Sequence, residues 1–120
     1  MNRLAIICVD DEEIILRSLA KQLKRNFDPR RYDIELASSG EEALALCAEL
    51  NAEKIPIALI ISDQIMPEMS GDELLIRLHA IYPQALKILL TGQAGVDSMG
   101  NIVNAAALYR YIAKPWDETD

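Results

Sequence analysis

The chain has 120 residues, a length that suits one domain with a single hydrophobic core. Hydrophobic residues make up 51% of the chain and charged residues 26%, a composition that excludes an intrinsically disordered segment. The formal net charge of −7 repels phosphate backbones, so we expect no nucleic-acid binding by this domain, whereas clustered carboxylates suit a hard divalent cation.

Three further features indicate a cytoplasmic protein. No apolar run approaches the roughly 20 residues of a membrane-spanning helix, so we expect no membrane contact. No basic start is followed by an apolar leader, which argues against a secretory signal. Cys8 and Cys47 lie in apolar patterns on different elements, where core thiols are expected in a reducing compartment and a disulfide is the less favoured alternative.

Five segments predict β-strands. Residues 4–9 are apolar without alternation, which is typical of a strand buried on both faces. Residues 32–37 alternate, with Ile34 and Leu36 on one face, and predict an edge strand. Leu59–Asp63 is an apolar run that predicts a strand buried on both faces, and Leu86–Leu90 and Leu108–Ala113 predict a fourth and a fifth strand.

Helical spacing of apolar residues predicts a helix after each of the first four strands. Asp10–Glu13 open the first helix, and capping boxes open the second and third, at Ser39 with Glu42 and at Ser70 with Glu73. The fourth helix carries two glycines and is expected to be the least rigid. The expected apolar stripes are Leu16, Leu19, Ala20, Leu23 and Phe27, then Ala43, Leu44, Cys47 and Leu50, then Leu74, Leu75, Leu78 and Ile81.

The alternation of strands and helices predicts an α/β fold with a parallel sheet and right-handed crossovers. Reactive side chains follow the central strands: Asp10 and Asp11 the first, then Asp63, Thr91 and Lys114. Open α/β sheets bind their ligands at the carboxyl edge, so we expect these five side chains to share one site. An acidic pair by itself is explained by the field of a helix N-terminus, and the combination with the other three favours a site.

The strand ends carry four motifs: Val9-Asp10-Asp11-Glu12, the stretch from Asp63 through Met66-Pro67 and Met69 to Gly71, Leu90-Thr91-Gly92, and Tyr111-Ile112-Ala113-Lys114-Pro115. With these motifs in this order, the chain resembles the receiver domain of two-component response regulators over residues 4–116. The resemblance implies one receiver domain over residues 1–120, with a flavodoxin-like doubly wound sheet of five parallel strands in the order 2-1-3-4-5.

The resemblance also implies the chemistry of the site. Asp63 is the expected phosphoacceptor, whose carboxylate forms an acyl phosphate at the expense of the phosphohistidine of a sensor histidine kinase. Mg²⁺ is the expected cofactor. Asp11 and Asp63 would bind it directly, Asp10 through water, and Ile65 through its backbone carbonyl.

Further residues receive roles on the same ground. Lys114 is expected to neutralise phosphoryl charge, and Thr91 to donate a hydrogen bond to a phosphoryl oxygen, with the backbone N–H groups of Gln64 and Gly92 serving the other oxygens. Phosphorylation would draw Thr91 inward and let Tyr111 rotate, changing a surface that a downstream output domain or protein reads. The domain would assist only its own phosphorylation and dephosphorylation, so we do not expect an enzyme.

The sequence departs from the family after Lys114-Pro115, where a fifth helix is normal. Only residues 116–120 follow, so we expect this helix to be missing or truncated and the chain to be a fragment that lacks an output domain. An uncovered sheet face usually finds a partner, so we expect a homodimer through that face.

We also expect particular roles or positions for four further side chains. Ile65 is apolar and follows the acceptor by two positions, so we expect it to hinder water and prolong the phosphoryl state. Met66 and Met69 are expected to pack the loop rather than to bind metal. His79 lies on the polar side of the third helix and is expected to be exposed.

Three alternatives remain beside this interpretation. A Mg²⁺-dependent phosphohydrolase with an aspartyl intermediate needs a second acid two residues after the nucleophile, where this chain has Ile65. An interaction module that works without phosphorylation leaves the acceptor set unexplained. A flavin-binding domain needs a hydroxyl- and glycine-rich phosphate loop after the first strand, where this chain has acidic residues.

Overall fold

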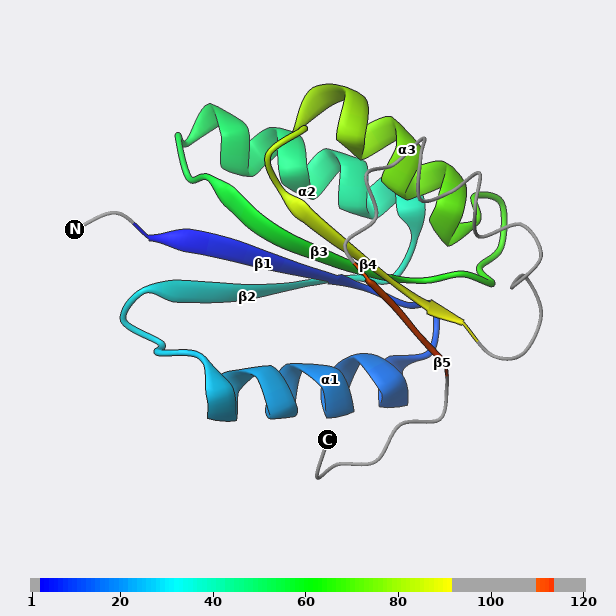
Figure 1. Ribbon diagram of the computed structural model, residues 1–120, viewed down its shortest axis with the longest axis horizontal. Coiled ribbons are helices and arrows are strands. Elements are labelled where there is room, and N and C mark those ends of the chain that lie inside the picture. Colours follow the sequence, from blue (N-terminus) through cyan, green and yellow to red (C-terminus); the bar gives the residue numbers. More distant parts are fainter. Residues whose placement is uncertain (1–2, 92–109, 114–120) are drawn as a thin grey trace.

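Five parallel strands form one sheet in the computed structural model, which describes residues 3–91 and 110–113 (Figure 1). The strand order is β2-β1-β3-β4-β5, so the doubly wound, flavodoxin-like α/β fold is confirmed. The predicted fourth helix and any fifth helix lie outside the described residues. The elements are β1 (Leu4–Val9), α1 (Glu13–Asn26), β2 (Tyr32–Ala37), α2 (Gly40–Ala52), β3 (Ile57–Asp63), α3 (Gly71–Ile81), β4 (Leu86–Thr91) and β5 (Arg110–Ala113).

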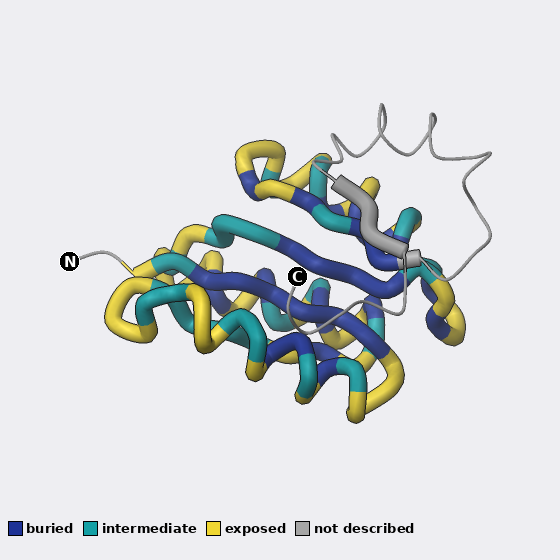
Figure 2. The backbone as a smooth tube through the Cα atoms, turned by 60° about the horizontal axis from the view of Figure 1, so that its bottom comes forward, coloured by how far each residue is buried: buried dark blue, intermediate teal, exposed yellow. Residues whose placement is uncertain are grey.

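Helices cover both faces of the sheet, α1 one face and α2 with α3 the other (Figure 1). Successive side chains of a strand point to opposite faces, so a central strand between two helical layers is apolar throughout. In β1, Ile6 and Cys8 pack with α1, whereas Ile7 and Val9 belong to the core cluster with α2 and α3. Figure 2 shows these buried strands between helices whose outer surfaces are exposed.

The second helix begins as its capping box predicted. Ser39 precedes α2, and its Oγ accepts a hydrogen bond from the backbone N–H of Glu42 at 3.1 Å. In a complete capping box the Glu42 carboxylate would also accept a hydrogen bond from the backbone N–H of Ser39. Here the carboxylate instead accepts a hydrogen bond from the Ser38 hydroxyl at 2.9 Å. Three residues of the predicted apolar stripe of α2 are buried, namely Ala43, Cys47 and Leu50.

The predicted apolar stripe of the third helix is buried, except for its last residue. Leu74, Leu75 and Leu78 are fully buried, whereas Ile81, the last residue of α3, is 59% exposed. The helix stops there because the residue before a proline is disfavoured in helical conformation, and Pro83 follows Tyr82. Ile81 therefore lies beyond the part of the helix that packs on the sheet.

Lys87 of β4 is a buried lysine, with its side chain inside the layer between the sheet and α3. Its Nζ lies 2.9 Å from Nδ1 of His79 and donates a hydrogen bond to the backbone carbonyl of Tyr82 at 3.0 Å. Burial lowers the pKa of the Lys87 ammonium group. The prediction that His79 is exposed is wrong, because its half-buried ring is a partner of this ammonium group.

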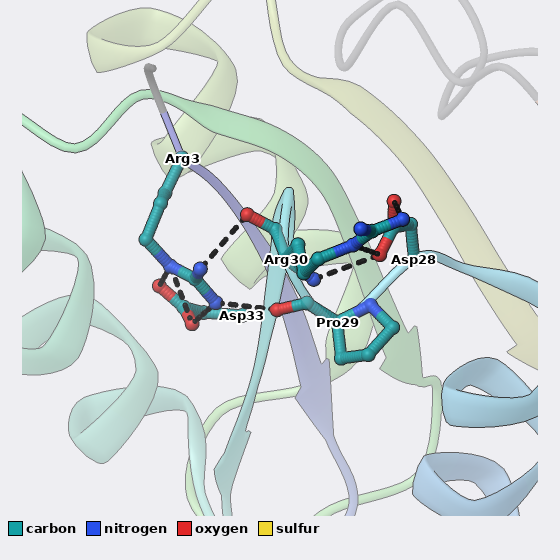
Figure 3. Close-up of polar contacts among 5 residues, drawn as sticks. All are labelled: Arg3, Asp28, Pro29, Arg30 and Asp33. Atoms are coloured by element: carbon teal, nitrogen blue, oxygen red, sulfur yellow. Dashed lines mark hydrogen bonds and ion pairs between the residues drawn. The ribbon is translucent and has the colours of Figure 1, made fainter.

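Arg3 ties the start of β1 to the loop between α1 and β2 (Figure 3). Its guanidinium forms an ion pair with Asp33 and donates hydrogen bonds to the backbone carbonyls of Arg30 at 2.9 Å and Pro29 at 2.8 Å. The hydrogen bond from Arg3 holds the pKa of the Asp33 carboxyl below its ordinary value. This contact fixes the amino edge of the sheet, away from the edge at which the strands end.

The two cysteines are free and buried on opposite faces of the sheet, as their apolar patterns predicted. Burial raises the pKa of Cys8 to about 12 and that of Cys47 to about 11, so both remain thiols at neutral pH. Within residues 3–91 and 110–113, no helix has the length and apolar character needed to cross a bilayer.

Candidate functional site

Two carboxylates stand at the ends of neighbouring central strands. Asp63 is the last residue of β3, and Asp10 directly follows β1. Val9 pairs with Ser62 in the parallel ladder, so the next residue on each strand, Asp10 and Asp63, lies at the same level of the sheet's carboxyl edge. Asp10 is fully buried and Asp63 is 4% exposed. Two buried carboxylates on adjacent strands repel one another unless hydrogen-bond donors or a cation offset their charge.

Asp11 and Glu12 extend the acidic site to the solvent. Carboxylate oxygens of Asp10, Asp11 and Glu12 lie within 4.8 Å of one another, and the latter two residues are exposed. The prediction that Asp10 and Asp11 begin the first helix is wrong, because α1 starts at Glu13 and Glu12 is its N-cap residue. Asp10 Oδ1 instead accepts a hydrogen bond from the backbone N–H of Glu12 at 2.9 Å, which fixes the turn that brings the three acids together.

Gln64, the residue after the predicted acceptor, is bonded to two neighbouring elements. Its backbone N–H donates to the carbonyl of Leu90 at 2.9 Å, and its carbonyl accepts from the N–H of Gly71 at 2.9 Å. Its side-chain Oε1 accepts from the backbone N–H of Asp72 at 2.8 Å. The Gln64 N–H, which was expected to serve a phosphoryl oxygen, is thus bonded to the end of β4 in this structure.

Two glycines let the loop after β3 pack tightly. A Cβ atom on Gly71 would lie 2.1 Å from the backbone oxygen of Asp63, so only glycine allows α3 to start this close to the acceptor strand. A Cβ atom on Gly40, at the start of α2, would lie 2.8 Å from Sδ of Met69. Within the loop, Glu68 adopts a positive φ of 69°. The loop is thus held against α3 and α2 by close contacts.

The capping box predicted for the third helix is not formed. Ser70 is the N-cap residue of α3, but its side chain makes no capping hydrogen bond. Its hydroxyl donates instead to the carboxylate of Asp72. The Asp72 backbone N–H is capped by the Gln64 side chain, so the helix start is bonded to the strand end that carries Asp63.

The apolar residues of the loop divide into one exposed and two buried side chains. Ile65 is 70% exposed, and no acid stands at this position. Met66 and Met69 are 8% and 6% exposed and belong to the core cluster under α2 and α3, so their predicted packing role is confirmed. The backbone carbonyl of Ile65, a predicted metal ligand, belongs to the loop segment that follows Gln64 directly.

The remaining predicted site residues lie on β4, on β5 and beyond it. Thr91 is the last residue of β4 and pairs with Ala113 of β5, so it ends at the same carboxyl edge as Asp63. Tyr111 pairs with Leu89 in the ladder. Lys114 follows β5 directly and, like Gly92, lies outside the described residues.

Sequence patterns missed three contributors to this site. Glu12 was part of the acidic motif, but no role was expected for its carboxylate. The capping role of Gln64 has no sequence signal, because its partner Asp72 is eight residues away. The close approach of Gly71 to Asp63 was signalled only by a glycine at the start of an apolar helical stripe, where glycine is otherwise unfavourable.

Comparison with known proteins agrees with this geometry. The sequence model of the family "Response regulator receiver domain" matches residues 6–120. The hydrogenase transcriptional regulatory protein HoxA of Cupriavidus necator is 31% identical over 111 residues, which are 92% of this chain and 21% of that protein. The transcriptional regulatory protein FixJ of Rhizobium meliloti is 29% identical over 119 residues, 99% of this chain and 53% of that protein. The chain therefore spans about half or less of these curated relatives.

Solved structures give the same result. The signal receiver domain of an HD domain-containing protein from Pseudomonas fluorescens Pf-5 superposes with a TM-score of 0.81 at 34% identity, covering 98% of this chain and 87% of that one. A CheY-like response regulator receiver domain protein from Methanospirillum hungatei JF-1 superposes with a TM-score of 0.80 at 31% identity. The match covers 99% of this chain and 87% of that one. The chain belongs to the family of response regulator receiver domains of two-component signalling.

Proposed function

We propose that residues 1–120 form a phosphoacceptor domain in which Asp63 receives a phosphoryl group with the help of Mg²⁺. The observation that carries this proposal is the pair of buried carboxylates, Asp10 and Asp63, at the carboxyl ends of adjacent strands. Two buried acids at the edge where open α/β sheets bind their ligands favour a binding role.

The acidic residues fit a magnesium ion by the chemistry of their donors. Asp10, Asp11 and Asp63 offer hard oxygen ligands, and Asp11 is open to the solvent, as a metal that retains several waters requires. We propose Asp11, Asp63 and the Ile65 carbonyl as direct ligands and Asp10 as a ligand through water. A bound Mg²⁺ would offset the negative charge shared by these carboxylates and the incoming phosphoryl group.

The transfer itself follows from the nucleophile. A carboxylate oxygen of Asp63 attacks phosphorus, an oxygen–phosphorus bond forms, and the nitrogen–phosphorus bond of a phosphohistidine breaks, releasing a neutral imidazole once that nitrogen has taken up a proton. Thr91 donates its hydroxyl to a phosphoryl oxygen, and Lys114 supplies a positive charge. Both roles rest on the family resemblance and on the position of each residue at or just after a strand end.

The donor and the reader of the signal are proposed on the same ground. A sensor histidine kinase in the cytoplasm would supply the phosphoryl group, and a downstream output domain or protein would read the phosphorylated form. Thr91 and Tyr111, on the adjacent strands β4 and β5, are the proposed switch pair, with Thr91 moving towards the phosphoryl group and Tyr111 rotating.

The test uses the chain with a small phosphodonor. Incubation with acetyl phosphate and Mg²⁺ is expected to add one phosphoryl group to the intact mass, and the Asp63→Asn variant is expected to gain none. Omission of Mg²⁺ should suppress the modification of the wild-type chain. An unmodified wild-type chain, or equal modification of Asp63→Asn, would contradict the proposal.

A further inference from the structure

The side chain of Gln64 makes a hydrogen bond that joins the acceptor strand to the next helix. Its Oε1 accepts the backbone N–H of Asp72, the second residue of α3, at 2.8 Å. Its backbone adds bonds to Leu90 and Gly71, each at 2.9 Å. One residue thus links the end of β3, the end of β4 and the start of α3.

The first turn of α3 needs this acceptor because its own cap residue is engaged elsewhere. The first N–H groups of a helix lack partners within the helix and are normally capped by the side chain of the N-cap residue. Here the hydroxyl of Ser70 donates to the Asp72 carboxylate, and the Ser70 side chain makes no capping bond. Gln64 is half-buried, so its amide faces less competition from water than an exposed cap would.

The bond bears on the proposed ligands because of where Gln64 stands in the chain. Asp63, which precedes it, carries the acceptor carboxylate, and Ile65, which follows it, carries the carbonyl proposed to bind Mg²⁺. The Asp63 end is also fixed by Gly71, which packs against its backbone oxygen. The other end enters an exposed stretch, in which Ile65, Pro67 and Glu68 are exposed.

We infer that Gln64 is a positioning residue whose amide oxygen, by capping α3, holds the Ile65 carbonyl and the Asp63 carboxylate in the arrangement that binds Mg²⁺; this inference rests on the proposed function. Groups that orient metal ligands without touching the metal act in this way, and their removal typically weakens metal binding by about 10–100-fold. Gln64 would then affect the metal affinity through the geometry of its neighbours alone.

Three variants distinguish the effect of the hydrogen-bond acceptor atom of Gln64 from the effect of the size of its side chain. Gln64→Met keeps the length of the side chain without an amide oxygen. Gln64→Asn keeps the amide, but it is one methylene too short to reach the Asp72 N–H. Gln64→Glu keeps an acceptor oxygen at the same reach. Hydrogen exchange of the Asp72 amide reports the cap, and calorimetric titration with Mg²⁺ alone reports the site.

In Gln64→Met and Gln64→Asn we expect the Asp72 amide to exchange faster and the Kd for Mg²⁺ to rise by about tenfold. In Gln64→Glu we expect wild-type protection of the Asp72 amide and a Kd no weaker than that of the wild-type chain. Faster exchange of the Asp72 amide with an unchanged Kd for Mg²⁺ would show that Gln64 only caps α3. Unchanged exchange would show that the hydrogen bond from Asp72 to Gln64 does not protect this amide. Either result overturns the inference. A wild-type chain that binds no Mg²⁺ would instead show that the proposed function has failed.

Discussion

Lys87 is a charged residue inside the protein, in the layer between the sheet and α3. Charged side chains are almost never fully buried unless partners satisfy them, and here His79 and the Tyr82 carbonyl do so. The burial of Lys87 could not be predicted from the sequence. A single lysine near the start of an otherwise apolar strand is usually exposed to solvent at the end of the sheet. Its free-energy contribution depends on pH, since burial disfavours the charged form.

The pKa of Lys87 is lowered in the folded chain from its ordinary value of 10.5. Below the lowered pKa of the folded chain, burial of the charged ammonium group reduces the free energy of unfolding. This loss shrinks as the pH rises through the lowered pKa and vanishes only above 10.5, where Lys87 is neutral in both states. We predict that the stability of the wild-type chain relative to a Lys87→Met variant increases between pH 7 and pH 10. Urea denaturation of both proteins at the two pH values measures this difference.

The exposed Lys24 of α1 supplies the control for this prediction. The difference in stability between the wild-type chain and Lys24→Met should stay nearly constant over the same pH range, because an exposed lysine is solvated equally in both states. A Lys87→Met difference that also stays constant would contradict the assigned effect of burial.

The elements of the fold show where sequence patterns succeed and where they fail. The central strands were predictable because a sheet covered on both faces requires continuous apolar runs such as residues 5–9 of β1. The edge position of β2 followed from its alternation. The start of α3 at Ser70 was predictable, but its capping bond was not, because the Ser70 hydroxyl bonds to Asp72 and the cap comes from Gln64, a tertiary contact that no local pattern encodes.

The loop between β3 and α3 depends on a close approach that can be tested by substitution. A Cβ atom on Gly71 would overlap the backbone of Asp63, which cannot move without disturbing the strand end. We predict that Gly71→Ala lowers the free energy of unfolding by about 3 kcal/mol, the upper end of the usual cost of overpacking. Urea denaturation at neutral pH gives this value.

Gly40→Ala is a matched control, because Gly40 is likewise the first residue of a helix and gains the same helical propensity from alanine. Its Cβ would meet the side chain of Met69, whose flexible thioether can move aside. The loss in Gly40→Ala should therefore be less than half of that in Gly71→Ala. Equal losses would show that the contact with the Asp63 backbone is not the cause.

At the scale of the whole molecule, the site is a product of sheet topology. Asp10 and Asp63 are far apart in sequence and become neighbours because β1 and β3 are adjacent parallel strands in register. Motif order at strand ends was enough to predict this juxtaposition, since an α/β sheet brings the carboxyl ends of its strands to one edge. The bonds that hold the loops at that edge, such as the turn from Asp10 to Glu12, had to come from the structure.

The position of the phosphoryl group in the chain is the decisive test of Asp63 as the phosphoacceptor. The chain is treated with acetyl phosphate and Mg²⁺, reduced with borohydride, which converts an aspartyl phosphate into homoserine, and mapped by peptide mass spectrometry. We predict homoserine at position 63 in the treated chain and none without the phosphodonor. Homoserine at Asp10 or Asp11 in place of Asp63, or no homoserine in a chain that has gained a phosphoryl group, would contradict it.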